Sequence, residues 1–344
     1  MRTSSFSRRD FLKLTGYGLL GALAPYYPFH KLQADEFDNL QGRVVNRTMW
    51  SYGAPNYKAK RKNLYWRDLV LPIINTTVGD DVTAYNRTWY QLADGEYAYS
   101  GSLQPVHTML NTAVPISLKG AMGEISVPFT DGRDLLEPNS TVLYRLYYES
   151  VHWVVASAVD PSDGSIWYLL LDDKYPVNYY VRGEHVRLMT SDELSPISPG
   201  LSLADKRIEV RLDEQMVLAY EKDNLVFAVL AATGGRLRSG TYTTPNGDFS
   251  TFHKRPTRHM AAGDLAASGF DLPGVPWVIY FKENGLSFHG TYWHNDYGHP
   301  RSHGCINLTP QAAKWLYRWT MPVVPFEKTF IYGQLGTAVH IEAA

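Results

Sequence analysis

The sequence predicts a mainly β protein, with two small N-terminal β-barrel modules followed by a mostly antiparallel β domain that carries one short helix. Three observations support this fold class. The chain has 344 residues, enough for two or three domains of about 100–200 residues each. Short apolar runs separated by turn pairs such as Asp94-Gly95 and Asp163-Gly164 recur along it, as is typical of strands joined by hairpins. Only residues 310–320 show clear start and stop signals of a helix.

Composition narrows the classes of function. A content of 44% hydrophobic and 19% charged residues can form a buried core, which excludes general disorder. The 33 Lys and Arg residues and 34 Asp and Glu residues give a net charge of −1, so no nucleic acid partner is expected. The single cysteine, Cys305, excludes an intramolecular disulfide, a CxxC redox pair and a multi-cysteine zinc site.

Residues 1–34 are typical of a twin-arginine export signal. Arg8 and Arg9 precede an uncharged stretch over residues 14–29, which is the order found in such signals. This stretch is shorter than the roughly 20 residues of a membrane span. We therefore expect an extracytoplasmic protein, membrane-anchored if the signal is not cleaved. A cytosolic basic amphipathic N-terminus is the alternative.

Two all-β modules are predicted between the signal and the C-terminal domain. The first covers residues 42–108, where a Trp-Tyr run at 88–92 precedes a Gly-turned aromatic run at 96–99; this order resembles bacterial SH3-type domains. The second covers residues 110–195, and a Pro-rich linker at 195–200 follows it.

The C-terminal domain is predicted over residues 203–340. Its elements are an antiparallel meander, a polar surface flap, a tight hairpin around Glu283-Asn284-Gly285, and a helix with Thr309 as cap and Pro310 at its first position. The predicted ranges are 206–212, 215–221 and 225–232 for the meander, 244–260 for the flap, 277–281 and 286–289 for the hairpin, and 311–320 for the rest of the helix.

The candidate catalytic residues are concentrated in residues 289–307. Four of the 11 histidines lie there beside the only cysteine. A free thiol in an oxidising compartment indicates a reactive role, and a neighbouring imidazole is expected to lower its pKa. Gly304 lets backbone N–H groups converge near the sulfur, as an oxyanion hole requires. A buried, unreactive Cys305 is the alternative. A zinc site is not expected, because no H-E-x-x-H or paired-ligand spacing is present.

The motif Ser302-His-Gly-Cys-Ile-Asn307, preceded by His289-Gly290-Thr291, resembles the signature of L,D-transpeptidases of the YkuD type. Residues 215–221 are similar to an early strand of that family, and residues 241–249 are similar to its Thr-Pro-x-Gly-x-Phe turn. The resemblance covers roughly residues 203–340. It implies a mostly antiparallel β catalytic domain with a short helix after the catalytic cysteine.

The resemblance also implies a reaction and its residues. A donor tetrapeptide of peptidoglycan would acylate Cys305, and an acceptor amine would then attack the thioester, so that two stem peptides become cross-linked without a cofactor or metal. His289 would donate and accept the proton, and the Gly290 carbonyl would orient its ring. Backbone N–H groups of His303, Gly304 and Cys305 would bind the oxyanion, while the His303 side chain shapes the site. An L,D-carboxypeptidase acting on the same peptides and an inactive wall-binding protein are the alternatives. With this function the protein is expected in the cell wall or envelope, where the two N-terminal modules would hold it. Their deletion is expected to weaken binding to the wall and to spare activity on small soluble peptides.

Several residues are candidates for binding the substrate. Arg301 could pair with a substrate carboxylate, or it could be a solvated loop charge. Asn307 and Ser302 flank the cysteine, and Asn307 could hold the loop by hydrogen bonds. Three aromatic residues are candidate walls of the groove, with plain surface or core packing as the alternative: Tyr242, Tyr292 and Trp293.

Overall fold

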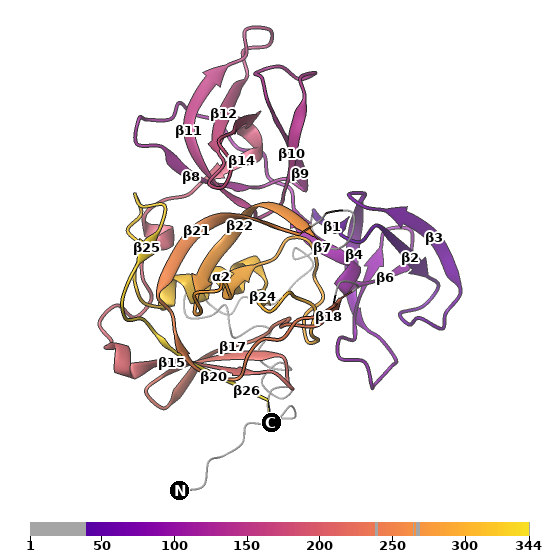
Figure 1. Ribbon diagram of the computed structural model, residues 1–344. Coiled ribbons are helices and arrows are strands. Elements are labelled where there is room, and N and C mark those ends of the chain that lie inside the picture. The colour runs from indigo at the N-terminus through magenta and orange to yellow at the C-terminus, as the bar shows by residue number, and fades with distance from the viewer. Residues whose placement is uncertain (1–38, 238–239, 264, 266–268, 344) are drawn as a thin grey trace, which may run out of the picture.

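The computed structural model describes residues 39–343 except 238–239, 264 and 266–268. These residues form three parts, namely two seven-stranded sheets and a C-terminal part with two five-stranded sheets (Figure 1). The mainly β class is therefore confirmed. The predicted export signal, residues 1–34, lies outside the described residues. Within the described ranges, no helix is long and apolar enough to span a membrane.

The first module is a seven-stranded sheet with the order β3-β2-β6-β5-β4-β1-β7. Val44, Ile73 and Leu103, from the adjacent strands β1, β4 and β7, are fully buried or nearly so in one apolar cluster. The bounds are β1 Leu40–Val44, β2 Thr48–Tyr52, β3 Arg61–Trp66, β4 Val70–Val78, β5 Thr88–Leu92, β6 Tyr97–Tyr99, the 3-10 turn η2 Ser100–Ser102, and β7 Leu103–His107.

The second module repeats this topology. Its order is β10-β9-β13-β12-β11-β8-β14, which is the order of the first module with every number raised by seven. A 3-10 turn precedes the last strand in both modules. The bounds are β8 Ala121–Ile125, β9 Phe129–Arg133, β10 Val142–Tyr147, β11 Val151–Val159, β12 Ile166–Leu171, β13 Asn178–Arg182, η3 Gly183–His185 and β14 Val186–Leu188. The chain thus contains a structural repeat that its short apolar runs did not reveal.

The C-terminal part contains the sheets β17-β16-β15-β26-β20 and β24-β23-β22-β21-β25, with β18 and β19 as a separate pair. The predicted meander and hairpin are confirmed, since β15, β16 and β17 pair antiparallel and β22 pairs with β23. The bounds are η4 Asp192–Leu194, η5 Leu203–Asp205, β15 Lys206–Arg211, β16 Met216–Glu221, β17 Asn224–Leu230, β18 Arg236–Leu237, β19 Gly240–Thr241, β20 Gly247–Ser250, β21 His253–Ala262, β22 Phe270–Tyr280, β23 Ser287–Gly290, β24 Ile306–Leu308, β25 Ile331–Tyr332 and β26 Ala338–Glu342.

The predicted helix is confirmed as α2, Pro310–Trp319. The Thr309 hydroxyl accepts the Ala312 N–H at 3.2 Å, which caps the helix start. At the other end, two buried lysines supply the hydrogen-bond donors that the last carbonyls of a helix otherwise take from water. Lys206 Nζ donates to the Trp319 carbonyl at 2.9 Å, and Lys254 Nζ donates to the Thr320 carbonyl at 2.7 Å.

The surface flap predicted over residues 244–260 is wrong for most of that range. Strand β20 pairs with β26, and β21 pairs with both β22 and β25. Its polar side chains serve internal contacts, because Lys254 caps α2 and the Thr257 hydroxyl donates to the Val151 carbonyl of the second module. The polarity of β21 therefore reflects contacts with α2 and with the second module.

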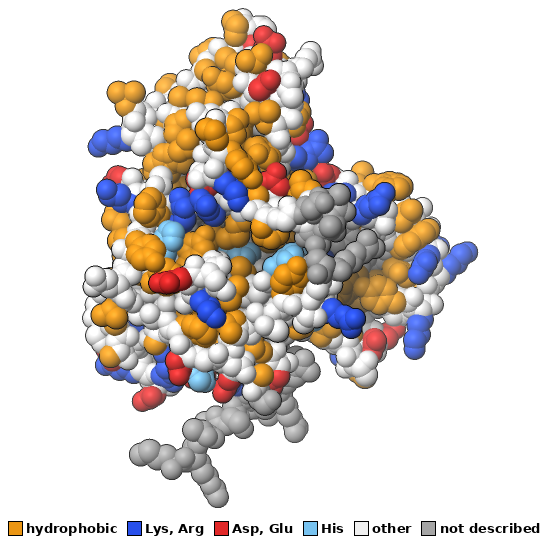
Figure 2. All heavy atoms as spheres, in the orientation of Figure 1, with side chains coloured by type: hydrophobic (Ala, Val, Ile, Leu, Met, Phe, Trp, Pro, Cys, Tyr) orange, Lys and Arg blue, Asp and Glu red, His pale blue; other side chains and the backbone are white. Residues whose placement is uncertain are grey.

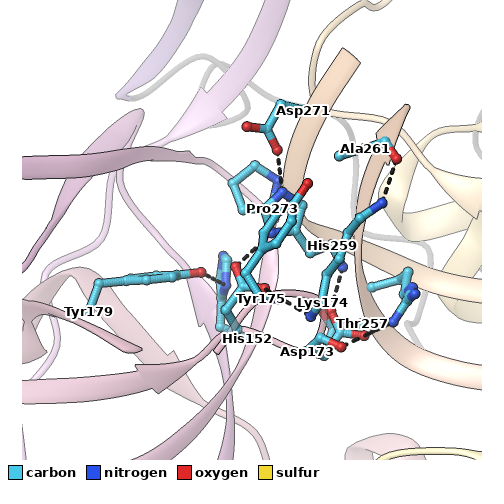
Figure 3. A network of polar contacts seen from close by, with 12 residues as sticks. His152, Asp173, Lys174, Tyr175, Tyr179, Thr257, His259, Ala261, Asp271 and Pro273 are labelled. Carbon is cyan, nitrogen blue, oxygen red and sulfur yellow. Dashed lines mark hydrogen bonds and ion pairs between the residues drawn. The ribbon is translucent and has the colours of Figure 1, made fainter. Parts of the chain in front are cut away.

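The second module packs on β21 and β22 through charged side chains (Figures 1 and 3). His259 of β21 lies between two carboxylates, with Asp172 Oδ2 2.6 Å from its Nδ1 and Asp271 contacting its Nε2. Arg258 pairs with Asp173 at 2.9 Å. This network fixes the long β21–β22 hairpin against the second module.

Candidate active site

Strand pairing brings the predicted catalytic residues together. Strands β23 and β24 are parallel, with Phe288 opposite Ile306 and His289 opposite Asn307. Side chains alternate between the two faces of a strand. Phe288 and Ile306 therefore point together into the core, where both are fully buried. His289 follows Phe288 in β23 and Cys305 directly precedes Ile306 of β24, so by this alternation both side chains lie on the other face.

The Cys305 thiol is half-buried and lies against the neighbouring strand. Its Sγ is 3.7 Å from the Ser287 hydroxyl oxygen and 3.8 Å from the Gly285 carbonyl oxygen. Burial raises the pKa of the thiol, and hydrogen bonds from the Ser287 backbone and side chain act in the opposite direction. The resting sulfur at neutral pH is therefore a thiol.

The His289 ring is buried and oriented by the chain itself. Its Nδ1 lies 3.0 Å from the Gly290 carbonyl oxygen. Because a carbonyl only accepts, Nδ1 carries the proton and Nε2 is left as the acceptor. Burial lowers the pKa of His289 to about 4, against the opposing hydrogen bond to Gly290. The net shift of the thiol pKa is upward, opposite to the direction expected from a neighbouring imidazole, because burial disfavours the charged forms of both groups.

Gly304 forms the turn before the cysteine at a φ of +111°, in the left-handed region that favours glycine. A Cβ there would lie 2.9 Å from Leu286 Cδ2. The Gly304 N–H donates to the Ser302 hydroxyl oxygen at 3.1 Å, and that hydroxyl donates to the Cys305 carbonyl. The prediction that the Gly304 N–H binds an oxyanion is thus corrected: Ser302 takes this donor to close the turn.

Aromatic rings border the site on two sides. The Tyr242 and His303 rings are 4.5 Å apart in an edge-to-face arrangement, and Phe270 lies 5.2 Å from His303. The Trp293 ring is 5.7 Å from that of His289. Figure 2 shows histidine side chains gathered in a hollow near the middle of this face, with apolar side chains around it.

Three of the proposed substrate-binding residues have other contacts. Tyr292 is 1% exposed and its hydroxyl donates to the Pro273 carbonyl at 2.8 Å, so it is a core residue rather than a groove wall. Arg301 Nη1 lies 2.8 Å from Asp296 Oδ2. The guanidinium expected to bind a substrate carboxylate is therefore already paired with a carboxylate of the protein. Asn307 is buried and its side-chain nitrogen lies 2.9 Å from His294 Nε2.

Sequence reasoning missed three residues that shape the site. Ser287, beside the sulfur, lies two positions before His289 and so on the same strand face. The Thr244 hydroxyl donates to the Gly304 carbonyl at 2.8 Å, and its place in a Thr-Pro turn was the available signal. Asp296 binds partners from the first module, about which local sequence says nothing. Across the described residues, no group of three or more His, Cys, Asp or Glu side chains could hold a metal ion.

The family model described as the L,D-transpeptidase catalytic domain, YkuD, matches residues 205–341. No curated protein sequence matches the chain. Among solved structures, a mutant L,D-transpeptidase of Enterococcus faecium is similar at 22% identity and a TM-score of 0.31, over 42% of this chain and 51% of that one. The match thus spans about half of the Enterococcus chain.

Two further structures are similar. An L,D-transpeptidase from Mycobacterium smegmatis has 16% identity and a TM-score of 0.33, over 52% of this chain and 90% of that one. One from Xylanimonas cellulosilytica has 28% identity and a TM-score of 0.29, over 40% of this chain and 60% of that one. The family-model match is confined to residues 205–341, which are the C-terminal part of the chain.

Proposed function

We propose that this protein cross-links peptidoglycan stem peptides through a thioester on Cys305, because residues 205–341 match the family model of the L,D-transpeptidase catalytic domain, YkuD. The observation that carries the proposal is the neutral pair of a single thiol and a buried imidazole on one sheet face. His289 has its acceptor nitrogen unprotonated at neutral pH, because burial lowers its pKa to about 4. It is therefore ready to act as a base.

The first half-reaction forms the acyl-enzyme. Cys305 Sγ attacks the carbonyl carbon of the L-centre residue in a donor tetrapeptide, while His289 Nε2 takes the thiol proton. A raised thiol pKa beside a weakly basic imidazole makes the resting ion pair unfavourable, so proton transfer accompanies carbon–sulfur bond formation. The backbone N–H of Cys305, after the turn at Gly304, is the candidate oxyanion donor. The C–N bond then breaks, and the leaving D-residue takes the proton from His289.

The second half-reaction regenerates the thiol. An acceptor amine attacks the thioester carbon, His289 accepts the amine proton, and the carbon–sulfur bond breaks as the proton returns to sulfur. Water in place of the amine would give an L,D-carboxypeptidase. Tyr242, Trp293 and the His303 ring would border the bound peptide and so influence this choice, which is supported by the contacts of the Tyr242 ring with His303 and of the Trp293 ring with His289.

Incubation of the purified chain with a disaccharide-tetrapeptide, with products resolved by mass, tests the proposal. We expect a cross-linked dimer and one acyl adduct on the intact protein. Cys305→Ala should lose both products while its melting temperature stays at the wild-type value. Tripeptide without dimer would assign the chain as a hydrolase. Turnover by Cys305→Ala would remove Cys305 as the nucleophile.

We also propose export by the twin-arginine route and binding of the wall by the two N-terminal modules. The paired arginines at residues 8 and 9 and the aromatic content of the modules support these proposals. Replacement of both arginines by lysine should leave the protein in the cytoplasmic fraction. A fragment that contains only the two modules should sediment with purified sacculi if the modules bind the wall. A fragment that stays in the supernatant would count against that role.

A further inference from the structure

The loop between the two catalytic residues is held by the first module. Arg43 Nη2 of β1 donates to the Tyr292 carbonyl at 2.6 Å. The Asn295 side chain donates to the Ser100 carbonyl of η2 at 3.2 Å. A loop of this length has many accessible conformations unless folded neighbours restrain it. Here much of the restraint comes from residues about 200 positions earlier in the chain.

Asp296 is the centre of this contact. The hydroxyls of Tyr85 and Tyr99, both from the first module, donate to its carboxylate at 2.9 Å. Its side chain is 9% exposed. Gly101 packs directly on it, because a Cβ at that position would lie 2.6 Å from Asp296 Oδ1. The first module thus supplies both hydrogen bonds and close packing around one buried carboxylate.

The carboxylate of Asp296 also contacts the residues that precede the Ser302–Cys305 turn. Asp296 Oδ2 lies 2.8 Å from Arg301 Nη1 and 3.0 Å from His299 Nε2. The N–H groups of Arg301 and Ser302 both donate to the Thr233 carbonyl, at 2.7 and 2.8 Å. The Ser302 hydroxyl then closes the turn onto Cys305. A chain of direct contacts therefore links Tyr85 and Tyr99 to the backbone that carries the nucleophile.

A second anchor lies at the start of the loop. Arg43 is buried, pairs with Asp68 at 3.0 Å, and lies 4.1 Å from the centre of the Tyr147 ring of the second module. Tyr147 stacks on Tyr292 of the loop at 5.5 Å. All three parts of the protein therefore meet at the segment that follows His289.

We propose that the first module is a structural component of the active site, and that Asp296 is a positioning residue that holds the catalytic loop in register. The inference rests on the proposed role of Cys305 as the nucleophile. It reverses the expectation from sequence that removal of the N-terminal modules leaves activity on small peptides intact. Misplacement of a reacting group by about 1 Å can cost on the order of 100-fold in rate.

The test compares full-length variants that differ by hydroxyl groups alone. Tyr85→Phe with Tyr99→Phe removes both donors to Asp296 and keeps the rings. Tyr97→Phe, in the same strand as Tyr99, is the matched control. Two kinds of measurement are made well below the melting temperature. The first is the rate at which iodoacetamide alkylates the only thiol across pH, and the second is kcat and KM on the tetrapeptide.

We expect the double variant to lose about tenfold in kcat and to slow alkylation, with KM within a factor of about two and Tyr97→Phe unchanged. Wild-type kcat and alkylation rates in the folded double variant would overturn the proposal. The contact of Tyr85 and Tyr99 with Asp296 would then only join the first module to the catalytic part. The alkylation measurement needs no peptide substrate. A wild-type chain that makes no peptide product would therefore contradict the proposed function while the positioning role is still decided.

Discussion

The two N-terminal modules have one strand order, yet they meet the catalytic part with different side chains. The first module contacts the loop between His289 and Cys305 through tyrosine hydroxyls, Arg43 and a close glycine. The second module contacts this loop through the Tyr147 ring, which stacks on Tyr292, and its polar contacts are with α2 and the β21–β22 hairpin, outside the loop. A duplicated scaffold therefore serves the catalytic part in two ways.

The difference is visible at equivalent positions of the two sheets. Arg43 on β1 is the register partner of Gln104 on β7, and Glu124 on β8 is the register partner of Arg187 on β14. The positive charge has thus moved from one strand of the pair to the other. In the first module it binds a loop carbonyl, whereas Arg187 binds Glu124 and also Glu193. The second interface is an ionic network, and salt should weaken it more than the first.

Loss of Arg43 should have the largest effect. Arg43→Met leaves the Tyr292 carbonyl and the Gln104 side chain without their buried donor. We expect a loss of about 3 kcal/mol in the free energy of unfolding, as for a broken buried ion pair, and a fall in kcat because the loop is released. Urea denaturation and turnover on the tetrapeptide measure the two effects.

Arg187→Met is the matched variant in the second module. Arg187 is 27% exposed, and Glu193 keeps its contact with Lys314 when Arg187 is removed. A partly solvated pair contributes about 1 kcal/mol or less, and we expect kcat to stay at the wild-type value. An equal fall in kcat for both variants would break the distinction between the modules.

The His259 interface should give the second-largest effect, with a defined pH dependence. Burial alone would lower the pKa of His259, but its hydrogen bonds to Asp172 and Asp271 outweigh burial and raise it. Burial likewise opposes the lowered pKa of Asp172, which its contacts with His259 and the Tyr175 and Lys174 N–H groups produce. The rings of Tyr144 and Tyr175 flank the imidazole.

The signs follow from linkage. The raised pKa of His259 gives stability that is complete below its ordinary value of about 6.5 and is lost as pH rises through the folded pKa. The lowered pKa of Asp172 gives stability that is lost as pH falls through its folded pKa. His259→Gln should therefore cost about 2 kcal/mol near pH 5–6 and less at alkaline pH. Melting temperatures of both proteins across pH measure this, and a constant difference between them would refute the charged form.

Local features of this fold could be predicted from sequence, while its long-range contacts could not. The Thr309-Pro310 helix start, the Glu283–Gly285 hairpin and the Cys305 motif each involve residues close in sequence, so short-range chemistry identifies them. Asp296 and Tyr99 are 197 positions apart, and neither belongs to a motif. The repeat stayed hidden because strand pairing, rather than residue identity, defines it. The pKa shifts of Cys305 and His289 follow from burial, which a linear sequence does not give.

The smallest expected effect concerns Glu149, which lies at the interface of the second module with α2 and receives a hydrogen bond from Gln311. Burial, with a contribution from Glu124, raises the pKa of Glu149 to about 8. A raised carboxyl pKa means that the folded state binds more protons than the unfolded state, so stability falls as pH rises from about 4.5 to 8. Glu149→Gln keeps the acceptor for Gln311 and removes this cost. Because Glu149 is partly exposed, we expect the variant to be more stable by about 1 kcal/mol at pH 8 and equal to wild type at pH 5.

Denaturation midpoints at the two pH values measure the difference, with the exposed Glu137→Gln as a control that should change neither. In the first module the corresponding carboxylate is Asp68, which like Glu149 has a positive φ and follows the third strand. It pairs with Arg43 and Arg145, so Asp68→Asn should destabilise the protein where Glu149→Gln stabilises it. Opposite signs from the same amide replacement would show that the two interfaces differ in charge balance rather than in shape, and equal signs would contradict that view.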